Sequence, residues 1–419
     1  MQTYNDIFQE LIQASYQGNL NETINRIRKS GKSEQEKLEF LIHPENLPPV
    51  VHLSQDDCSS CSPAPSPCEV ACLFSAIKKD AEGRVVVSAE SCVGCARCLE
   101  SCEKGLLVDR KDFIPLFEEL STRKRPVYAM IAPAFVGQFS SEVTPGKLRT
   151  AFKKIGFYGM MEVALTADIL TLKEALEFDQ AIKKDQDFLL TSCCCPMWVA
   201  MIRKTYHTLI PHMPPSVSPM VACGRIIKYL HPEAMTVFIG PCIAKKAEAK
   251  EADIRDAVDF VLTFQEITDI FKAAGISLST LEEDARDHSS CGGRIYARTG
   301  GVSKAVSDTL ARLRPDRSIP LRSEQANGIV ECKKMLKNIL NNKIEANFLE
   351  GMGCIGGCVG GPKSLIKVDE ATKHVNDYCK TAPYPTPADN PFVMQLLDRL
   401  GFNTLETLLS HESIFTRKF

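Results

Sequence analysis

Long apolar runs and a strong net charge are both absent from this chain of 419 residues. No apolar stretch is long enough to span a bilayer, and the first residues lack the basic and apolar regions of a signal peptide. The formal net charge of −2 gives no electrostatic reason to expect a nucleic-acid partner. We therefore expect a cytoplasmic globular protein that binds neither membranes nor nucleic acids.

Cysteine, in contrast, is abundant and unevenly distributed, with 18 residues in the chain. Many lie between Cys58 and Cys102, three are consecutive at 193–195, and Cys354 and Cys358 flank a glycine pair. A disulfide framework is typical of small secreted chains, which this chain does not resemble. Adjacent cysteines also point in different directions and pair poorly with one another. Metal ligation is the better interpretation.

Changes in composition predict four segments. Residues 1–50 have apolar residues at helical spacing and form a helical extension, either packed on the next domain or used for docking. Residues 51–120 are rich in serine, proline and cysteine, so bound clusters must replace much of the core. Residues 121–375 have an α/β pattern, and residues 376–419 form a closing tail with a helix.

The α/β segment contains short apolar runs that predict buried strands at residues 127–131, 188–190, 237–239, 258–262 and 347–349. Helical patterns, including 167–182 and 264–274, separate them. Three of the strands lead directly into the remaining cysteine motifs. Open α/β sheets place their sites at the carboxyl ends of strands, so we expect these cysteines to converge.

Two four-cysteine groups precede this segment. The second group has the x2, x2, x3 spacing of bacterial two-cluster ferredoxins, in which the fourth cysteine binds the neighbouring cluster. The first group has a longer insertion, and no proline follows either group. Two tetrahedral zinc sites are the alternative. The pattern assigns one [4Fe–4S] cluster to Cys58, Cys61, Cys68 and Cys102, and a second to Cys92, Cys95, Cys98 and Cys72.

Three further motifs, in order, resemble the signature motifs of [FeFe]-hydrogenases. They are residues 191–198 (TSCCCPMW), 240–248 (GPCIAKKAE) and 350–358 (EGMGCIGGC), and residues 296–302 (YARTGGV) match another family segment. The triple cysteine and the Gly-Pro-Cys sequence indicate a divergent subgroup. The resemblance extends over roughly residues 55–370.

The resemblance implies an α+β ferredoxin-like two-cluster module, followed by an α/β H-cluster domain built of two lobes around a buried metal site. The H-cluster is a [4Fe–4S] cluster joined through Cys358 to a two-iron subcluster that carries CO, cyanide and azadithiolate. Its expected ligands in this sequence are Cys195, Cys242, Cys354 and Cys358. Soft thiolates suit iron–sulfur chemistry.

The same resemblance assigns the residues around the two-iron unit. Lys245 is expected to donate a hydrogen bond to cyanide, Met352 to pack against the unit, and Cys194 to pass protons to the azadithiolate amine. The helix at 166–177 resembles the family helix that bears relay carboxylates, which places them at Glu174 and Glu177. Their i, i+3 spacing puts both on one helix face, which without the resemblance would be an ordinary solvent-exposed face. The loops expected to surround the cofactor contain Ala132, Pro133, Gly240 and Pro241.

Several positions depart from the family pattern. Pro214 stands where a relay serine is expected, with Ser216 and Ser218 nearby, and Ala181 stands where an arginine is expected. Ala134 lacks a common hydroxyl, and Met220 replaces a common glutamine. The outer half of the proton path is therefore left open.

Besides Cys194, five cysteines lie outside the ligand sets. Cys193 is either a packed core thiol, which we favour, or a second relay or oxygen-sensitive group. The other four have no ligand partner at short spacing and are expected to be structural thiols: Cys223, Cys291, Cys332 and Cys379.

The function implied is reversible reduction of protons to H2, with electrons from ferredoxin or a similar small redox protein. Hydrogenase maturation proteins would be further partners. The alternatives are an H2 or redox sensor, an iron–sulfur assembly protein with little or no turnover, and a ferredoxin fused to an unrelated α/β domain. Retention of Cys194, Lys245 and Met352 argues against the assembly protein, which has no two-iron unit.

Overall fold

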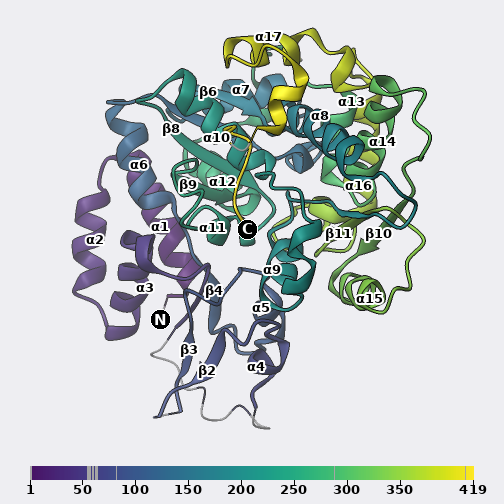
Figure 1. Cartoon of the computed structure of the whole chain (residues 1–419). Coiled ribbons are helices and arrows are strands. Elements are labelled where there is room, and N and C mark those ends of the chain that lie inside the picture. The colour runs from purple at the N-terminus through teal and green to yellow at the C-terminus, as the bar shows by residue number, and fades with distance from the viewer. Residues whose placement is uncertain are drawn as a thin grey trace.

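The computed structural model describes residues 2–53, 58, 61, 65–81, 83–286, 288–410 and 412–419. Two parallel β-sheets form the body of the molecule, and helices surround them (Figure 1). The cysteine-rich segment lies below the sheets, and the three amino-terminal helices lie at one side (Figure 1). Within the described residues, no helix is both long and apolar enough to cross a membrane.

The amino-terminal segment folds into helices that pack on the body. A capping box starts the first helix, because Thr3 and Asp6 each accept a hydrogen bond from the other's backbone N–H. Phe8, Leu11 and Ile12 are fully buried in the main core, and α1 contacts α6 and α12. The helices are α1 (Tyr4–Gln17), α2 (Leu20–Arg28) and α3 (Lys32–Ile42).

Two short antiparallel β-pairs and two one-turn helices make up the cysteine-rich segment. β1 pairs with β4, and β2 pairs with β3. Their small core combines a few aliphatic side chains with six of the cysteines. The elements are β1 (Val50–His52), α4 (Pro67–Ala71), β2 (Ile77–Lys79), β3 (Val85–Val87), α5 (Arg97–Ser101) and β4 (Leu107–Asp109).

The first sheet of the body has four parallel strands in the order β6-β5-β8-β9. Every residue of the central strand β8 is buried, as expected when helices cover both faces of a parallel sheet. Its strands are β5 (Val127–Ile131), β6 (Gly159–Glu162), β8 (Met235–Gly240) and β9 (Phe260–Thr263). The helices nearby in sequence are α6 (Phe113–Thr122), α7 (Pro145–Lys154), α8 (Val163–Ala181), α10 (Pro219–Leu230), α11 (Ala244–Glu248) and α12 (Phe264–Ala273).

The second sheet has three parallel strands in the order β10-β11-β7. Strand β10 was not predicted, because its sequence Ser-Glu-Gln-Ala-Asn is polar and mostly exposed. The strands are β7 (Leu189–Leu190), β10 (Ser323–Asn327) and β11 (Phe348–Met352). The helices are α9 (Pro196–Lys204), α13 (Cys291–Arg294), α14 (Gly301–Leu313), α15 (Ile329–Leu340), α16 (Val368–Lys380) and α17 (Pro391–Arg399).

Helix α8 connects the two parts of the body. It contacts α10 beside the first sheet and α13 and α14 beside the second, and nearly all of its side chains are buried. The Asp168 carboxylate fastens α13 to it by accepting hydrogen bonds from the backbone N–H groups of Ser290 (2.6 Å) and Gly293 (2.8 Å). Polar residues on α8 are therefore held rigidly between the two sheets.

A disulfide between Cys291 and Cys379 joins α13 to α16. The prediction that these two residues are free thiols is therefore wrong. The partners are 88 positions apart, so their spacing carries no signal, and only the packing of the two helices brings them together. Cys223 and Cys332 remain free and buried.

A buried ion pair fastens the end of the cysteine-rich segment to the second cysteine motif. The Lys246 ammonium lies 3.0 Å from a carboxylate oxygen of Glu266, and both side chains are fully buried. Lys246 also donates to the carbonyl of Arg110, just beyond β4, while Glu266 accepts from the backbone N–H of Thr263 (2.8 Å). The pair thus joins three segments that are distant in sequence.

Replacing Lys246 with methionine should lower the free energy of unfolding by about 3–5 kcal/mol, because it leaves Glu266 as an uncompensated buried charge. Anaerobic urea unfolding would measure the change. Lys250→Met, at an exposed lysine of the same segment, is the matched control. Equal stability of the two variants would show that the ion pair contributes little.

Candidate metal centre

The three cysteine motifs meet at the carboxyl ends of parallel strands, as predicted. The first follows β7, the second follows β8, and the third begins in β11. Because β7 and β11 are paired neighbours, the first and third motifs lie side by side, and the Gly353 N–H donates to the Cys195 thiol sulfur (3.3 Å). The second motif comes from the other sheet.

The four expected ligands of the main cluster lie within electrostatic range of one another. Burial, followed by the charges of Cys242 and Cys195, raises the pKa of Cys358 to about 12. Burial, followed by the same two neighbours and Cys358, holds the pKa of Cys354 well above its ordinary value. Such thiols are stabilised as thiolates by bound metal. The structure therefore brings together thiols from Cys195, Cys242, Cys354 and Cys358.

Two glycines in the third motif allow the backbone to approach other segments closely. Gly356 and Gly357 both have left-handed backbones, with φ of 86° and 85°. A side chain on Gly357 would come within 2.7 Å of the Thr299 backbone nitrogen, so only glycine fits. This pair brings Cys354 and Cys358 to the same site and packs their loop against residues 296–302, a segment that the sequence analysis singled out.

The structure buries Lys245 beside the thiols and pairs it with an acid. Its ammonium lies 2.6 Å from a Glu248 carboxylate oxygen. Burial lowers the pKa of Lys245, but Glu248 and then the thiols of Cys242 and Cys194 outweigh burial and raise the pKa overall. The side chain is therefore charged and faces the cysteines, unlike an ordinary solvated lysine at a helix start.

The remaining residues predicted around the two-iron unit lie in the cysteine motifs or on segments that adjoin them. Met352, Cys194 and Tyr296 belong to one buried cluster of side chains. Ala132 adjoins Gly240, where an added Cβ would lie 3.1 Å from the alanine Cβ. Pro133 starts the 3₁₀ turn after β5 (Pro133–Phe135), and the Pro241 carbonyl accepts from the Lys363 N–H (3.0 Å).

Glu174 lies on α8, fully surrounded by protein, and faces the first motif. Its carboxylate accepts hydrogen bonds from the Thr191 hydroxyl (2.7 Å) and the Cys193 thiol (3.4 Å). Burial raises the pKa of Glu174 to about 7, and the nearby Glu177 carboxylate adds to the rise. Cys193 is thus both packed and hydrogen-bonded to the first predicted relay carboxylate, a contact that its sequence position did not reveal.

Glu177 lies one turn further along α8, at the edge of the buried region. Its carboxylate accepts a hydrogen bond from the Ser216 hydroxyl (3.1 Å) and pairs with the ammonium of Lys173. Ser216 thus occupies the place that the sequence analysis left open at Pro214. Lys173 was missed, although its i, i+4 spacing to Glu177 was a usable signal.

The other departures lie outside this hydrogen-bonded group. Ala181 is the last residue of α8, and Ser218 caps α10 by accepting from the Val221 N–H (3.4 Å). Met220 and Ala134 are both buried in the main core.

The stability of the folded chain should fall as pH rises through the range in which Glu174 titrates. The raised pKa means that the folded chain keeps the Glu174 proton between pH 4.5, the ordinary glutamate value, and about 7, whereas the unfolded chain loses it. The stabilisation from the neutral carboxyl is therefore complete below pH 4.5 and lost by about pH 7. It amounts to roughly 3 kcal/mol, at about 1.36 kcal/mol per pH unit.

Glu174→Gln removes this titration, so its stability relative to the wild type should increase from pH 5 to pH 8. Urea unfolding at several pH values in that range would measure it. Glu118→Gln, at an exposed position, should show a constant difference. A constant difference for Glu174→Gln as well would contradict the raised pKa.

The cysteines of the second predicted amino-terminal cluster lie next to the main thiol group. A Cβ on Gly94, between Cys92 and Cys95, would lie 2.9 Å from the backbone of Ala244 in the second motif. The Cys95 thiol is also close enough to Cys354 to raise its pKa. An electron carrier bound at this set would thus adjoin the main site.

The cysteines of the first predicted cluster are further from the body. Cys58, Cys61, Cys68 and Cys102 line one cavity of about 190 Å³, and the His52 ring nitrogen lies 3.0 Å from the Cys58 sulfur.

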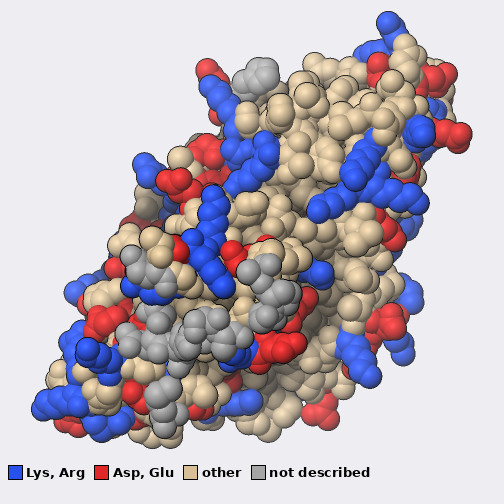
Figure 2. All heavy atoms as spheres, turned by 90° about the horizontal axis from the view of Figure 1, so that it is seen from below, with Lys and Arg blue, Asp and Glu red and all other residues tan. Residues whose placement is uncertain are grey.

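The face of the molecule seen from below carries both acidic and basic side chains, which are interspersed (Figure 2).

Among the described residues, no three metal-binding side chains converge closely enough for a single metal ion. In a four-iron cluster each thiolate binds a different iron, so its ligands are held further apart than those of a single ion.

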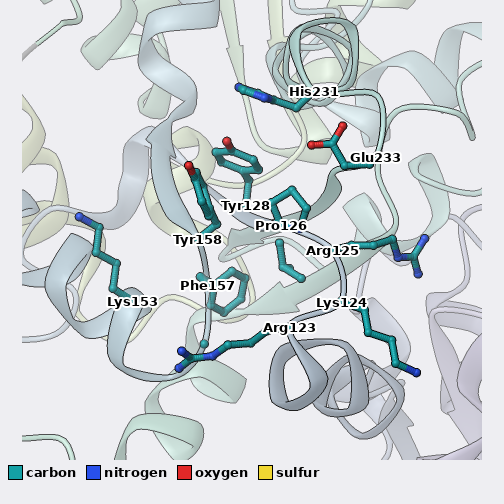
Figure 3. A pocket seen from close by; sticks show the side chains of 12 residues that line it. Arg123, Lys124, Arg125, Pro126, Tyr128, Lys153, Phe157, Tyr158, His231 and Glu233 are labelled. Atoms are coloured by element: carbon teal, nitrogen blue, oxygen red, sulfur yellow. The ribbon is translucent and has the colours of Figure 1, made fainter.

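A larger hollow of about 460 Å³ lies at the opposite, amino-terminal edge of the first sheet (Figure 3). Tyr128 stacks on His231 there, with ring centroids 5.5 Å apart. Two of its basic side chains are already neutralised, since Arg125 pairs with Glu119 (2.7 Å) and Lys153 with Asp284 (2.6 Å). The arginines and lysines point away from one another in Figure 3, so they form no common anion site.

The fold and the cysteine site together define an iron–sulfur protein of mixed α/β architecture. Residues 125–362, more than half of the chain, match the family described as "Iron only hydrogenase large subunit, C-terminal domain". The chain therefore belongs to this family, and the resemblance predicted from the three motifs is confirmed. The match begins at residue 125, so the ferredoxin-like fold of the amino-terminal module stays a prediction.

The relatives include hydrogenases and iron–sulfur assembly components. The chain is 28% identical over 387 residues to the periplasmic [Fe] hydrogenase large subunit of Nitratidesulfovibrio vulgaris, covering 79% of this chain and 91% of the relative. It is 25% identical over 378 residues to cytosolic iron-sulfur assembly component 3 of Pongo abelii, covering 74% and 79%.

A solved structure of an [FeFe]-hydrogenase from Chlamydomonas reinhardtii shares the fold. Its TM-score is 0.60 at 22% identity, and the match covers 73% of this chain and 98% of that one.

Proposed function

We propose that this protein is a hydrogenase that interconverts protons, electrons and H2 at an H-cluster. The observation that carries the proposal is a buried series of protonatable groups beside the four-thiol site. It begins at Cys194 and continues through Cys193 and Glu174 towards Glu177 at the protein edge. A protein that binds only a [4Fe–4S] cluster for electron transfer or assembly has no need of such a series.

The residues present fit the proposed cofactor. Four soft thiols surround one place. Gly356 and Gly357 allow the backbone between Cys354 and Cys358 to pack closely against its neighbours. The Ser192 hydroxyl beside them is buried and has no hydrogen-bond partner among the described residues, as expected where a further group binds. Cys195, Cys242, Cys354 and Cys358 would hold the [4Fe–4S] part, and Cys358 would also bridge to the two-iron unit.

Once bound, the two-iron unit supplies the redox chemistry that joins protons and electrons. Lys245 would donate to a cyanide ligand, because its charge is retained in the buried site. Met352, Ala132, Pro133, Gly240 and Pro241 would exclude water around the unit.

Cys194 would hold the transferable proton. Burial, then the charges of Cys193 and Cys358, keep the pKa of Cys194 well above its ordinary value, so the thiol stays protonated. A protonated thiol can donate at one side and be reprotonated from the other, which a relay requires. The Cys193 sulfur lies 3.4 Å from a Glu174 oxygen and 3.2 Å from the Val217 carbonyl oxygen, so it is placed to take part in reprotonation.

Electrons would arrive through the amino-terminal cysteines. The set at Cys92, Cys95, Cys98 and Cys72 adjoins the main site, and the set at Cys58, Cys61, Cys68 and Cys102 lies further out. Ferredoxin or a similar small redox protein would supply the electrons, and maturation proteins would insert the two-iron unit.

Infrared spectroscopy of anaerobically matured protein tests this proposal. Bands from metal-bound CO and cyanide that differ under H2 and argon are expected, together with H2 evolution from a reduced viologen dye. Responsive bands without turnover would favour a sensor. No such bands after maturation, with the [4Fe–4S] clusters present, would favour a role like that of the iron–sulfur assembly relative.

A further inference from the structure

Lys173, a lysine buried in the middle of α8, has no role in the proposed function as described so far. The Lys173 side chain is 1% exposed, although lysine is rarely buried without a partner. Its ammonium contacts the Glu177 carboxylate and donates to the Ser216 hydroxyl (2.6 Å). Burying an ammonium is unfavourable unless it is paired and hydrogen-bonded, so its placement depends on these two residues.

The hydrogen bonds around Ser216 have a defined direction. An ammonium can only donate, so the Ser216 oxygen accepts from Lys173 and its own proton is free to point elsewhere. That proton points to Glu177, whose two oxygens lie 3.1 and 3.2 Å from the serine oxygen. Two donors therefore converge on one carboxylate, an arrangement that favours its ionised form.

Lys173 also affects the pKa of Glu174, the glutamate nearer to the cysteine site. Burial is the main influence on both glutamates and raises each pKa, while the lysine charge opposes the rise at Glu177 and, more weakly, at Glu174. One cation thus serves two buried carboxyls. The group is electrically neutral when a single proton is shared between the two glutamates.

Other titratable groups face this cluster from neighbouring elements. Cys193 comes from the loop after β7, and Tyr296 from the turn before α14, where its hydroxyl lies 2.9 Å from the Thr171 hydroxyl. Both are neutral, because burial holds the pKa of each well above its ordinary value. Lys173 is therefore the cation that balances the two glutamates among the described residues.

We infer that Lys173 is a positioning residue that keeps Glu177 ionised and ready to accept a proton, and that with Ser216 it completes the outer half of the proton path. This inference rests on the proposed hydrogenase function. The Glu177 side chain is 10% exposed, so it is the carboxylate of the pair that reaches solvent. Lys173 lies one helical turn before Glu177. The family pattern instead places a cation after Glu177, an arginine at the position that Ala181 occupies in this chain.

The test is Lys173→Met in the matured protein, compared with Lys173→Arg, which keeps the charge. We expect Lys173→Met to lower H2 evolution about tenfold or more, with little change in KM for the dye, since proton transfer of this kind contributes about 10²–10⁴-fold. Lys173→Arg should restore most of the rate. Lys183→Met, at an exposed lysine just beyond α8, is the matched control.

Infrared spectra in the protonated-carboxyl region give a second readout that a merely structural role would not change. At pH 7, Lys173→Met should show one more protonated-carboxyl band than the wild type, and the double variant K173M/E177Q should lack it. If the methionine variant does not fold, Lys173→Gln provides the same comparison with a polar side chain.

Wild-type turnover in Lys173→Met, or reduced turnover without the added band, would overturn the inference. Failure of the proposed hydrogenase function would give a different result from failure of this inference. In that case the matured wild-type protein would lack CO and cyanide bands, while the protonated-carboxyl band of Lys173→Met could still be measured.

Discussion

Replacing Cys194 with alanine is expected to remove nearly all H2 turnover while the metal centres stay in place. The thiol belongs to the buried cluster that contains Met352 and is not one of the four cluster ligands. Alanine has no proton to pass on, so the series of groups that leads to Glu174 is broken at its inner end. General acid–base groups contribute about 10²–10⁴-fold to rate, and a loss in this range is expected.

The measurement combines iron content, infrared spectra and H2 evolution on the same matured sample. Cys223→Ala is the matched control, because Cys223 is fully buried in the main core and burial is the only influence that raises the pKa of its thiol. Wild-type turnover in Cys194→Ala would exclude it as the relay. Loss of the CO and cyanide bands in that variant would show instead that Cys194 is needed for assembly.

Replacing Cys358 with alanine is expected to prevent assembly of the two-iron unit altogether. Cys358 is the proposed link between the [4Fe–4S] cluster and that unit, and the charges of Cys242 and Cys195 act on its thiol. Without it, three thiols remain for the cluster and no sulfur joins the two parts. All CO and cyanide bands should be absent, and H2 turnover should be undetectable.

Cys332→Ala is the control for this variant. The Cys332 thiol is buried next to the third motif, 3.5 Å from the carbonyl of Met352, yet it belongs to no proposed ligand set. Its replacement should leave the infrared bands intact. Equal bands in the Cys358 and Cys332 variants would contradict the ligand assignment.

Much of the architecture could be predicted because its signals are local. The run at residues 127–131 became strand β5 with the predicted bounds, and the apolar runs before the three motifs became β7, β8 and β11. Strand β6 was missed because it is short and begins at Gly159, and polar β10 has no apolar signal. The bounds of α8 differ from the predicted 167–182 mainly at its start, Val163, where β6 leads directly into the helix.

By itself, the sequence determined which residues are chemically suited to the site: cysteines at cluster spacing, three ordered motifs, and two glutamates on one helix face. These are properties of spacing along the chain. The tertiary structure alone decided the partners of Glu174, the pairing of Lys173 with Glu177 and Ser216, and the Cys291–Cys379 disulfide. The serine, thiol and disulfide partners are separated by 19 to 88 positions, so their contacts depend on how α8 packs between two sheets. Lys173 and Glu177 are close in sequence, but an i, i+4 pair is ordinarily exposed, and only burial turns it into part of a site.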